Sequence, residues 1–292
     1  MVKCRERMAK GWYGLRNVVS MKWLLARMYE PDLVIVDCRF QLGQPESGRA
    51  AYTESHIPGA VYLDLEKDLS APLGEHGGRH PLPDIATLTG TLSRVGIGNN
   101  VRVVAYDDQG GAMASRLWWL LKYLGHEQAY VMDEGFAAWV KAGYPVSAEQ
   151  KVAIPSQFLA TVQHNMLAEV DEVRELLGSD RLTLIDSREA PRYRGEVEPI
   201  DRVAGHIPGA INRFWKDALD ERGAWKDVSG QAARFHDLPR ARELIVYCGS
   251  GVTACPNVLA LQEAGFQKVR LYAGSWSDWI SYEGNPVASG EE

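Results

Sequence analysis

The sequence predicts an α/β protein built from two tandem copies of one domain, each a mainly parallel β-sheet flanked by helices. The pentapeptide His-Ile-Pro-Gly-Ala at residues 56–60 recurs at residues 206–210. An apolar run that ends in Asp precedes it in both halves, at residues 33–37 and 182–186. Because these landmarks keep the same order in both halves, we interpret the chain as a duplication.

Within each half, short apolar strands alternate with helices. Runs rich in β-branched residues predict strands, and each is followed by an apolar helix that ends at a glycine. Strand–helix–strand repetition indicates right-handed crossovers and a parallel sheet. The expected strand, helix and strand are 101–106, 114–124 and 129–132 in the first half, and 244–247, 254–264 and 269–272 in the second.

Changes in composition suggest the domain boundaries. Residues 1–20 carry five basic side chains and one acidic side chain, and they lack the apolar run and cleavage site of a secretory signal. We interpret them as a basic extension, with a targeting peptide as the alternative, because a helical pattern opens at Met21. Residues 21–146 are then the first domain, 147–165 the linker, and 166–289 the second, catalytic domain.

Composition excludes several classes of function. The 292 residues are 46% hydrophobic and 24% charged, with a formal net charge of -6. Nucleic acid requires a basic surface, so we expect no such partner. No run of about 18 apolar residues is present, so we expect no contact with a membrane core. The four cysteines match no disulfide framework or metal motif, which favours a cytoplasmic protein without a bound metal.

Cys248 is the strongest candidate for a nucleophile. It ends a predicted buried strand and begins the loop Cys248-Gly249-Ser250-Gly251-Val252-Thr253. The backbone N–H groups of such a loop can converge at the N-terminus of the following helix and stabilise a thiolate. Ser250 and Thr253 add hydroxyl donors. The twin loop of the first half carries Asp107 at the matching position, so the first domain lacks the thiol.

The alternative for any single cysteine is burial as a structural residue. For Cys248, the glycine-rich loop that follows favours a functional role. Cys255 lies inside the next expected helix, and we interpret it as packed, with a resolving thiol as the alternative.

Three motifs together resemble the rhodanese family from about Leu33 onward. They are Asp-x-Arg at a strand end, the His-Ile-Pro-Gly-Ala turn, and the Tyr-Cys-Gly-Ser-Gly-Val-Thr-Ala loop. The tandem layout resembles the thiosulfate and mercaptopyruvate sulfurtransferases, in which the first domain is inactive and the second is active. The resemblance implies that Cys248 carries sulfur as a persulfide, without a metal or an organic cofactor.

Arg192 and Arg188 are the candidate substrate-binding residues. They follow the strand that ends at Asp186, at the sheet edge where open α/β folds bind ligands, and a guanidinium group there can hold an anion. In the family, the arginine just before the aromatic residue of this segment binds substrate, which implies Arg192. The alternative is a salt bridge to Glu189 or Glu196.

His56 begins the first of the two repeated turns, and His206 begins the second. A histidine present in both halves, only one of which has the cysteine, favours a structural role. Resemblance to the mercaptopyruvate enzymes suggests a first-domain histidine that faces the active serine, with an aspartate nearby. Residues 44–49 offer no clear aspartate, so catalytic support by His56 stays an alternative.

These features predict a sulfurtransferase with a small anionic sulfur donor, either 3-mercaptopyruvate or thiosulfate. The acceptor would be cyanide, a small thiol or a thioredoxin-like protein. Uncharged Gly249 and Ser250 favour mercaptopyruvate. Against it, Ile200 stands where such relatives often have the arginine of Glu-Pro-Arg, unless Arg202 fills that place. The alternatives are a non-enzymatic persulfide-binding or sulfur-sensing module, and a cysteine phosphatase, which needs an arginine that the loop lacks.

Overall fold

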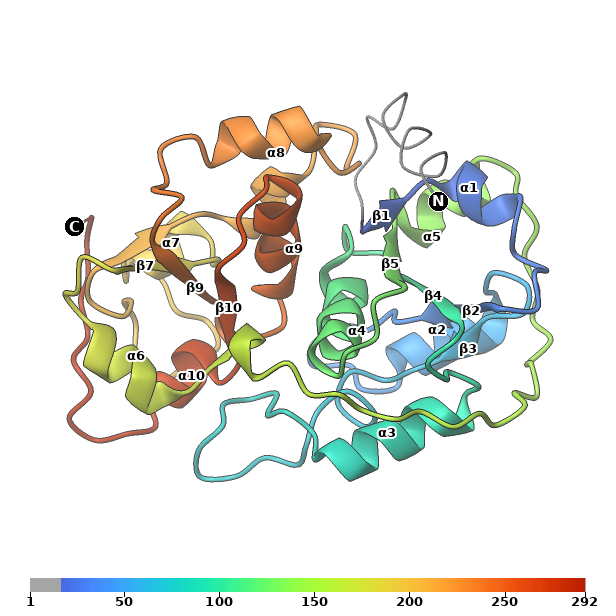
Figure 1. The fold of residues 1–292 in the computed structure, drawn as a ribbon, viewed down its shortest axis with the longest axis horizontal. Helices are drawn as coiled ribbons and strands as arrows, with labels where there is room; N and C mark the ends of the chain where they lie inside the picture. The colour runs from blue at the N-terminus through green and yellow to red at the C-terminus, as the bar shows by residue number, and fades with distance from the viewer. Residues whose placement is uncertain (1–16, 292) are drawn as a thin grey trace, which may run out of the picture.

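The structure, a computed structural model that describes residues 17–291, contains two similar α/β domains (Figure 1). The strands of the first sheet are β1 (Val18–Val19), β2 (Leu33–Asp37), β3 (Val61–Tyr62), β4 (Arg102–Tyr106) and β5 (Ala129–Met132). Those of the second are β6 (Leu167–Ala168), β7 (Leu182–Asp186), β8 (Ala210–Asn212), β9 (Glu243–Tyr247) and β10 (Val269–Tyr272).

Both sheets have the same topology. The order is β1-β5-β4-β2-β3 in the first sheet and β6-β10-β9-β7-β8 in the second, and every pair is parallel. Asp37 at the end of β2 pairs with Tyr106, and Asp186 at the end of β7 pairs with Tyr247. The equivalent register confirms the predicted duplication and the predicted fold class.

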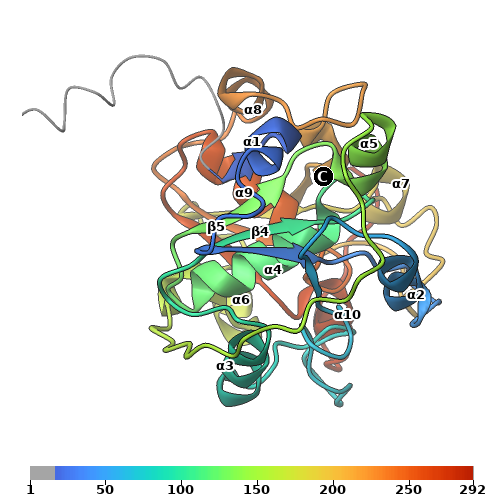
Figure 2. The same ribbon diagram turned by 90° about the vertical axis from the view of Figure 1, so that its right-hand side faces the viewer.

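Helices cover both faces of each sheet. The first domain contains α1 (Met21–Leu25), α2 (Ser47–Glu54), α3 (Ile85–Arg94), α4 (Ala112–Tyr123) and α5 (Gly135–Lys141). The second contains α6 (Val170–Leu176), α7 (Ala190–Tyr193), α8 (Val228–Arg234), α9 (Cys255–Glu263) and α10 (Ser275–Trp279). In the first domain, α3 and α4 lie in one core cluster, and α1, α2 and α5 lie in another (Figure 2).

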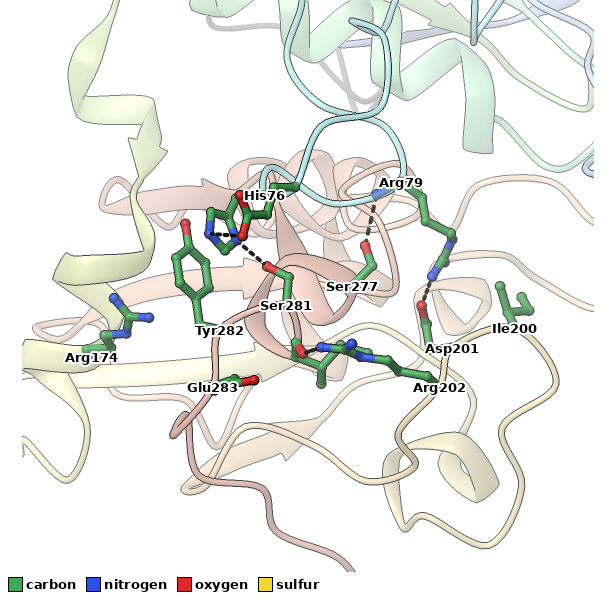
Figure 3. Close-up of a pocket in the computed structure, with 12 residues that line it drawn as sticks. His76, Arg79, Arg174, Ile200, Asp201, Arg202, Ser277, Ser281, Tyr282 and Glu283 are labelled. Carbon is green, nitrogen blue, oxygen red and sulfur yellow. Dashed lines mark hydrogen bonds and ion pairs between the residues drawn. The ribbon is translucent and has the colours of Figure 1, made fainter.

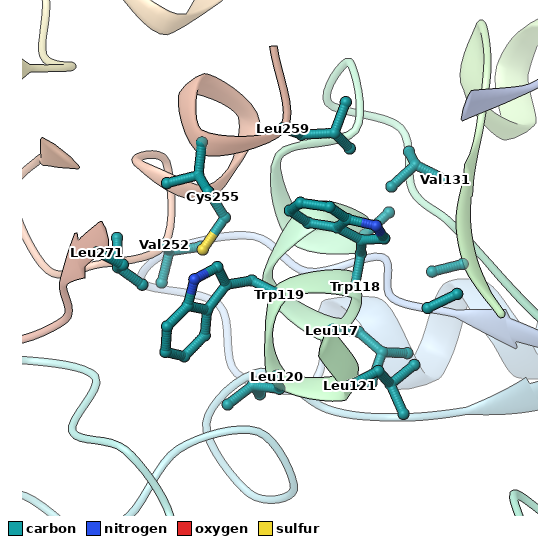
Figure 4. Packing of buried hydrophobic residues seen from close by; sticks show 14 of the residues in the cluster. Leu117, Trp118, Trp119, Leu120, Leu121, Val131, Val252, Cys255, Leu259 and Leu271 are labelled. Carbon is teal, nitrogen blue, oxygen red and sulfur yellow. The ribbon is translucent and has the colours of Figure 1, made fainter. Parts of the chain in front are cut away.

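The domains meet along α4 and α9. A single hydrophobic cluster contains the apolar residues of both helices, so the two cores are continuous. Almost every residue of α4 is buried, which is expected of a helix that is apolar all round. Trp118 and Trp119 of α4 pack here with Val252, Cys255 and Leu259 (Figure 4). The first domain therefore lies directly against the Cys248 loop.

One boundary differs from the prediction. Val18 and Val19 pair with β5, so the first sheet includes residues that we assigned to the extension. Residues 1–16 of the extension lie outside the described part of the chain. Along 147–165, Phe158 is buried and its amide donates to the Ser93 hydroxyl at 3.1 Å, so this segment packs against α3. The domain limits at 146 and 166 stay predictions.

Among residues 17–291, no helix combines the length and the apolar character that crossing a membrane requires.

Candidate active site

Cys248 follows β9 at the carboxyl edge of the second sheet. Its side chain is a free thiol and is almost completely buried. Its amide donates to the Ser275 hydroxyl at 3.1 Å, and its carbonyl accepts from the Trp276 amide at 3.0 Å. Ser275 has a positive φ of 57°, an uncommon conformation that fixes the start of α10 beside the thiol. The position of Cys248 is therefore set by two adjacent loops.

Residues 249–253 form the predicted glycine-rich loop at the start of α9. Gly251 has a φ of 77°, and a side chain there would collide with the carbonyl of Ala273. In the described part of the chain, the amides of Ser250 to Thr253 donate to no protein acceptor. Free amides at a helix N-terminus form a site for negative charge. This geometry supports the predicted cradle for a sulfur anion.

The first-domain loop provides an internal comparison. Asp107 occupies the position of Cys248, and its carboxylate accepts from the amides of Gln109, Gly111, Met113 and Ala114 at 2.8 to 2.9 Å. Burial raises the pKa of Asp107, and these four hydrogen bonds oppose that effect. The duplicated loop thus binds an anion that the chain itself supplies. In the second domain the same place is held by a thiol.

His80 is the histidine that faces the Cys248 loop. Its Nδ1 lies 2.8 Å from the Ser250 hydroxyl, and its side chain is buried. Burial, together with the charges of Arg116 and Arg79, lowers the pKa of His80 to about 4. A neutral imidazole at neutral pH can accept a hydrogen bond from the serine hydroxyl or donate one to it. The sequence analysis did not identify His80.

Both ring nitrogens of His56 lie against backbone carbonyl oxygens, which favours a structural role over catalytic support. Its Nδ1 lies 2.7 Å from the Tyr52 carbonyl and its Nε2 lies 3.0 Å from the Glu149 carbonyl. The ring stacks on Tyr52 with centroids 4.1 Å apart. His206 repeats the stack on Tyr193 at 3.9 Å. Both histidines fix their turns, as the repeat itself indicated.

A loop of the first domain, residues 75–80, contacts the second domain through His76 and Arg79 (Figure 3), and it carries His80 to Ser250. The His76 ring lies 2.7 Å from the Ser281 hydroxyl, the Gly77 amide donates to Asp278 at 2.7 Å, and the Arg79 amide donates to the Ser277 hydroxyl at 3.0 Å. All three acceptors belong to α10 or follow it directly. This contact places the 75–80 loop over the thiol-bearing loop.

Arg192 lies beside the Cys248 loop and lines the pocket there. A side chain built on Gly249 would lie 3.6 Å from Nη2 of Arg192 and 2.8 Å from Nη2 of Arg79. The salt-bridge partners differ from those considered, because Arg192 pairs with Glu198 at 2.7 Å and with Asp201 at 3.2 Å. Arg79 also pairs with Asp201. Two guanidinium groups, one from each domain, therefore flank the Cys248 loop.

A buried ion pair holds Arg188, which favours a structural role over the predicted substrate contact. Its side chain is 1% exposed and pairs with Asp186 at 2.6 Å and Glu198 at 3.3 Å. The first domain repeats the arrangement with Arg39 and Asp37 at 2.7 Å. An ion pair that is present in both domains fixes the strand end in each and does not bind a ligand of one domain.

Two cavities lie at this junction. The inner pocket, of about 120 Å³, is lined by Gly249, Ser250, His80, Arg79, Arg192 and Ile200, among others. The outer groove, of about 750 Å³, shares Arg79 and Ile200 with it and opens towards Arg174, Arg202, Tyr282 and Glu283 (Figure 3). Arg202 donates to the Ile280 carbonyl in the outer groove. Arg79, and not Arg202, therefore supplies a second guanidinium group to the inner pocket.

Cys255 and Cys38 are the other cysteines in the described part of the chain, and both are buried. Burial raises the pKa of Cys255 to about 12, and its thiol donates to the Gly251 carbonyl at 3.3 Å. Burial also raises the pKa of Cys38. No group of three His, Cys, Asp or Glu side chains among residues 17–291 could hold a metal ion.

Comparisons with known proteins agree with this site. A family model described as a rhodanese-like domain matches residues 20–142 and again residues 169–282. A probable 3-mercaptopyruvate sulfurtransferase of Pseudomonas aeruginosa is 46% identical over 94% of this chain and 99% of its own length. Thiosulfate sulfurtransferase of Rattus norvegicus is 35% identical over 91% and 92%.

A solved structure gives the same result. SseA from Escherichia coli, described as a 3-mercaptopyruvate sulfotransferase, has a TM-score of 0.77 and 31% identity, and covers 89% of this chain and 98% of its own. The duplicated fold, the cysteine loop and these matches lead to one conclusion: the chain belongs to the rhodanese family, and it is a sulfurtransferase.

Proposed function

We propose that the protein transfers sulfur in two steps and that Cys248 carries the sulfur as a persulfide between them. One observation carries the proposal: the loop that follows the free thiol of Cys248 lines one small pocket together with guanidinium groups from both domains, and its amides donate to no acceptor in the described part of the chain. Each feature suits an anionic sulfur donor or an anionic intermediate.

In the first step, the Cys248 thiolate attacks the outer sulfur of the donor. The sulfur–carbon bond of 3-mercaptopyruvate, or the sulfur–sulfur bond of thiosulfate, breaks with its electron pair on the leaving group. Arg79 and Arg192 would hold the donor's negative charge, and the buried Nε of Arg79 has no acceptor among the described residues. The loop amides would hold the persulfide.

The donor that the pocket favours is 3-mercaptopyruvate. Its leaving group is the enolate of pyruvate, which needs a hydrogen-bond donor and then a proton, and the Ser250 hydroxyl with His80 behind it offers both. Sulfite leaves thiosulfate without that need. The missing arginine at Ile200 argued against mercaptopyruvate, and Arg79 now supplies a guanidinium group in the same pocket.

In the second step, an acceptor nucleophile takes the terminal sulfur and releases the Cys248 thiolate. Cyanide would give thiocyanate and a thiol would give a new persulfide. The outer groove is a route for a larger acceptor, because it adjoins the inner pocket at Arg79 and carries both cationic and anionic side chains. A small thiol or a thioredoxin-like protein fits this route, in a cytoplasm where cysteines stay reduced.

Replacement of Cys248 tests the proposal. Cys248→Ser should abolish transfer from both donors while circular dichroism and thermal unfolding stay close to wild type. The matched control is Cys255→Ser, seven residues further along the chain, which should keep most of the activity. Near wild-type activity of Cys248→Ser would remove this residue from the mechanism. Persulfide formation without turnover, with every acceptor tried, would favour the sulfur-sensing alternative instead.

A further inference from the structure

Arg116 is a cation buried beneath the active-site loop. It lies on α4 of the first domain and has no exposed surface. Its Nη1 donates to the Gly251 carbonyl at 3.2 Å, and its Nη2 donates to the His80 carbonyl at 3.1 Å. The same Nη2 is 3.5 Å from the Leu69 carbonyl. One side chain therefore contacts both the thiol-bearing loop and the segment that carries the active-site histidine.

The charge of Arg116 has no carboxylate partner in the described part of the chain. Two other buried arginines, Arg39 and Arg188, lie just after strand ends. Each pairs with an aspartate, Arg39 at 2.7 Å and Arg188 at 2.6 Å. The oxygen atoms to which Arg116 donates among residues 17–291 are backbone carbonyls, and its Nε has no acceptor there. An unpaired buried ion costs the folded state free energy, so this placement calls for a reason beyond packing.

Among residues 17–291, the groups that can become anionic and that act on the charge of Arg116 are two thiols. Burial lowers the pKa of Arg116, and attraction to Cys255 and then to Cys248 opposes this effect. With a pKa of about 12, Cys255 stays a neutral thiol at physiological pH. Cys248 is then the remaining source of the missing negative charge. It lies three residues before Gly251, whose carbonyl Arg116 contacts.

We propose that Arg116 is the buried counter-charge of the anionic sulfur at Cys248 and a positioning residue for the cysteine loop and His80. The inference rests on the proposed function, because it requires a thiolate or persulfide at Cys248. It also assigns a task to the first domain, whose own loop holds Asp107. The domain supplies the second site with a charge from α4 as well as with Arg79 and His80 from its surface loop.

Two variants separate the charge of Arg116 from its hydrogen bonds. Arg116→Gln keeps amide donors and removes the charge, whereas Arg116→Lys keeps the charge and loses the planar fork. The control is Arg234→Gln on α8, because Arg234 also donates to a carbonyl and has unpaired buried nitrogens, but lies outside both cavities.

The readouts are the alkylation rate of Cys248 by iodoacetamide at pH 7, kcat and KM with 3-mercaptopyruvate, and the thermal midpoint. We expect Arg116→Gln to slow alkylation and lower kcat by at least roughly tenfold, with donor KM changed by less than about threefold. Arg116→Lys should recover most of the alkylation rate. The thermal midpoint of Arg116→Gln should stay close to wild type, since glutamine keeps an amide donor for the carbonyl oxygens that Arg116 contacts.

The result that overturns the inference is a folded Arg116→Gln protein with wild-type alkylation and kcat. Equal loss in the Lys and Gln variants, accompanied by a lower thermal midpoint, would also overturn it, because hydrogen bonding alone would then explain the residue. If Arg116→Gln does not fold, Arg116→Lys decides, since the proposal requires near wild-type alkylation there. A wild-type enzyme that forms no persulfide with either donor would instead contradict the proposed function.

Discussion

The burial of His80 should make the folded protein less stable in acid. The pKa of His80 is lowered to about 4 from the ordinary value of 6.5, chiefly by burial. Between these values the unfolded chain binds more protons than the folded one, so stability rises with pH across this window. The contribution is complete above about pH 6.5 and is lost as pH falls to about 4. The full difference is worth roughly 3 kcal/mol.

Urea unfolding of wild type and His80→Asn at pH 7 and pH 4.5 measures this contribution. Between these two pH values the wild type should lose about 2.5 kcal/mol more than the variant, because asparagine takes up no proton. His236→Asn, which replaces an exposed histidine, is the control and should behave as wild type. If wild type and His80→Asn lose the same stability, His80 is not held neutral by burial and its assignment beside Ser250 is wrong.

Three further predictions concern individual side chains. Ser250→Ala should lower kcat/KM for 3-mercaptopyruvate by roughly 10²–10³ but lower that for thiosulfate much less, because only the enolate uses the hydroxyl; equal losses would contradict the leaving-group role. Arg79→Gln and Arg192→Gln should each raise donor KM by roughly ten- to a hundredfold through loss of a charge-assisted hydrogen bond, whereas Arg202→Gln should leave donor KM unchanged. A larger effect at Arg202 would make Arg202, and not Arg79, the arginine that binds the donor. His56→Asn should reduce the free energy of unfolding by about 1–3 kcal/mol and leave donor kcat/KM unchanged, because both ring nitrogens lie within hydrogen-bond distance of carbonyl oxygens. Loss of activity at unchanged stability would favour a catalytic role instead.

The fold was predictable because the sequence contains the same series of landmarks in both halves. The paired landmarks predicted two mainly parallel sheets, the placement of the helices between strands and the asymmetry between Asp107 and Cys248 without any knowledge of tertiary contacts. The limits of the prediction are local. β1 has only two residues, too few for a periodic pattern, and its membership of the first sheet depends on pairing with β5 across more than a hundred positions.

From the sequence, only the part of the site that lies in one continuous loop was predictable. Cys248 and residues 249–253 are consecutive, whereas His80 and Ser250 are 170 positions apart and meet through the domain interface. His80 and Arg79 lie on an irregular connection between β3 and α3, at the carboxyl edge where such folds bind ligands, and that location is the signal that could have identified them. Arg188 and His56 carried the opposite signal, because each has a twin in the other domain.

The most direct test of the account is to locate the transferred sulfur. The enzyme is incubated with 3-mercaptopyruvate without acceptor, thiols are blocked with iodoacetamide, and the digested peptides are measured by mass spectrometry. We predict one extra sulfur atom on Cys248, measured on a peptide that contains Cys248 but not Cys255. This extra sulfur should be lost when cyanide is added before blocking. Extra sulfur found only on Cys255 or Cys38, or none on Cys248 during active turnover, would contradict the central claim.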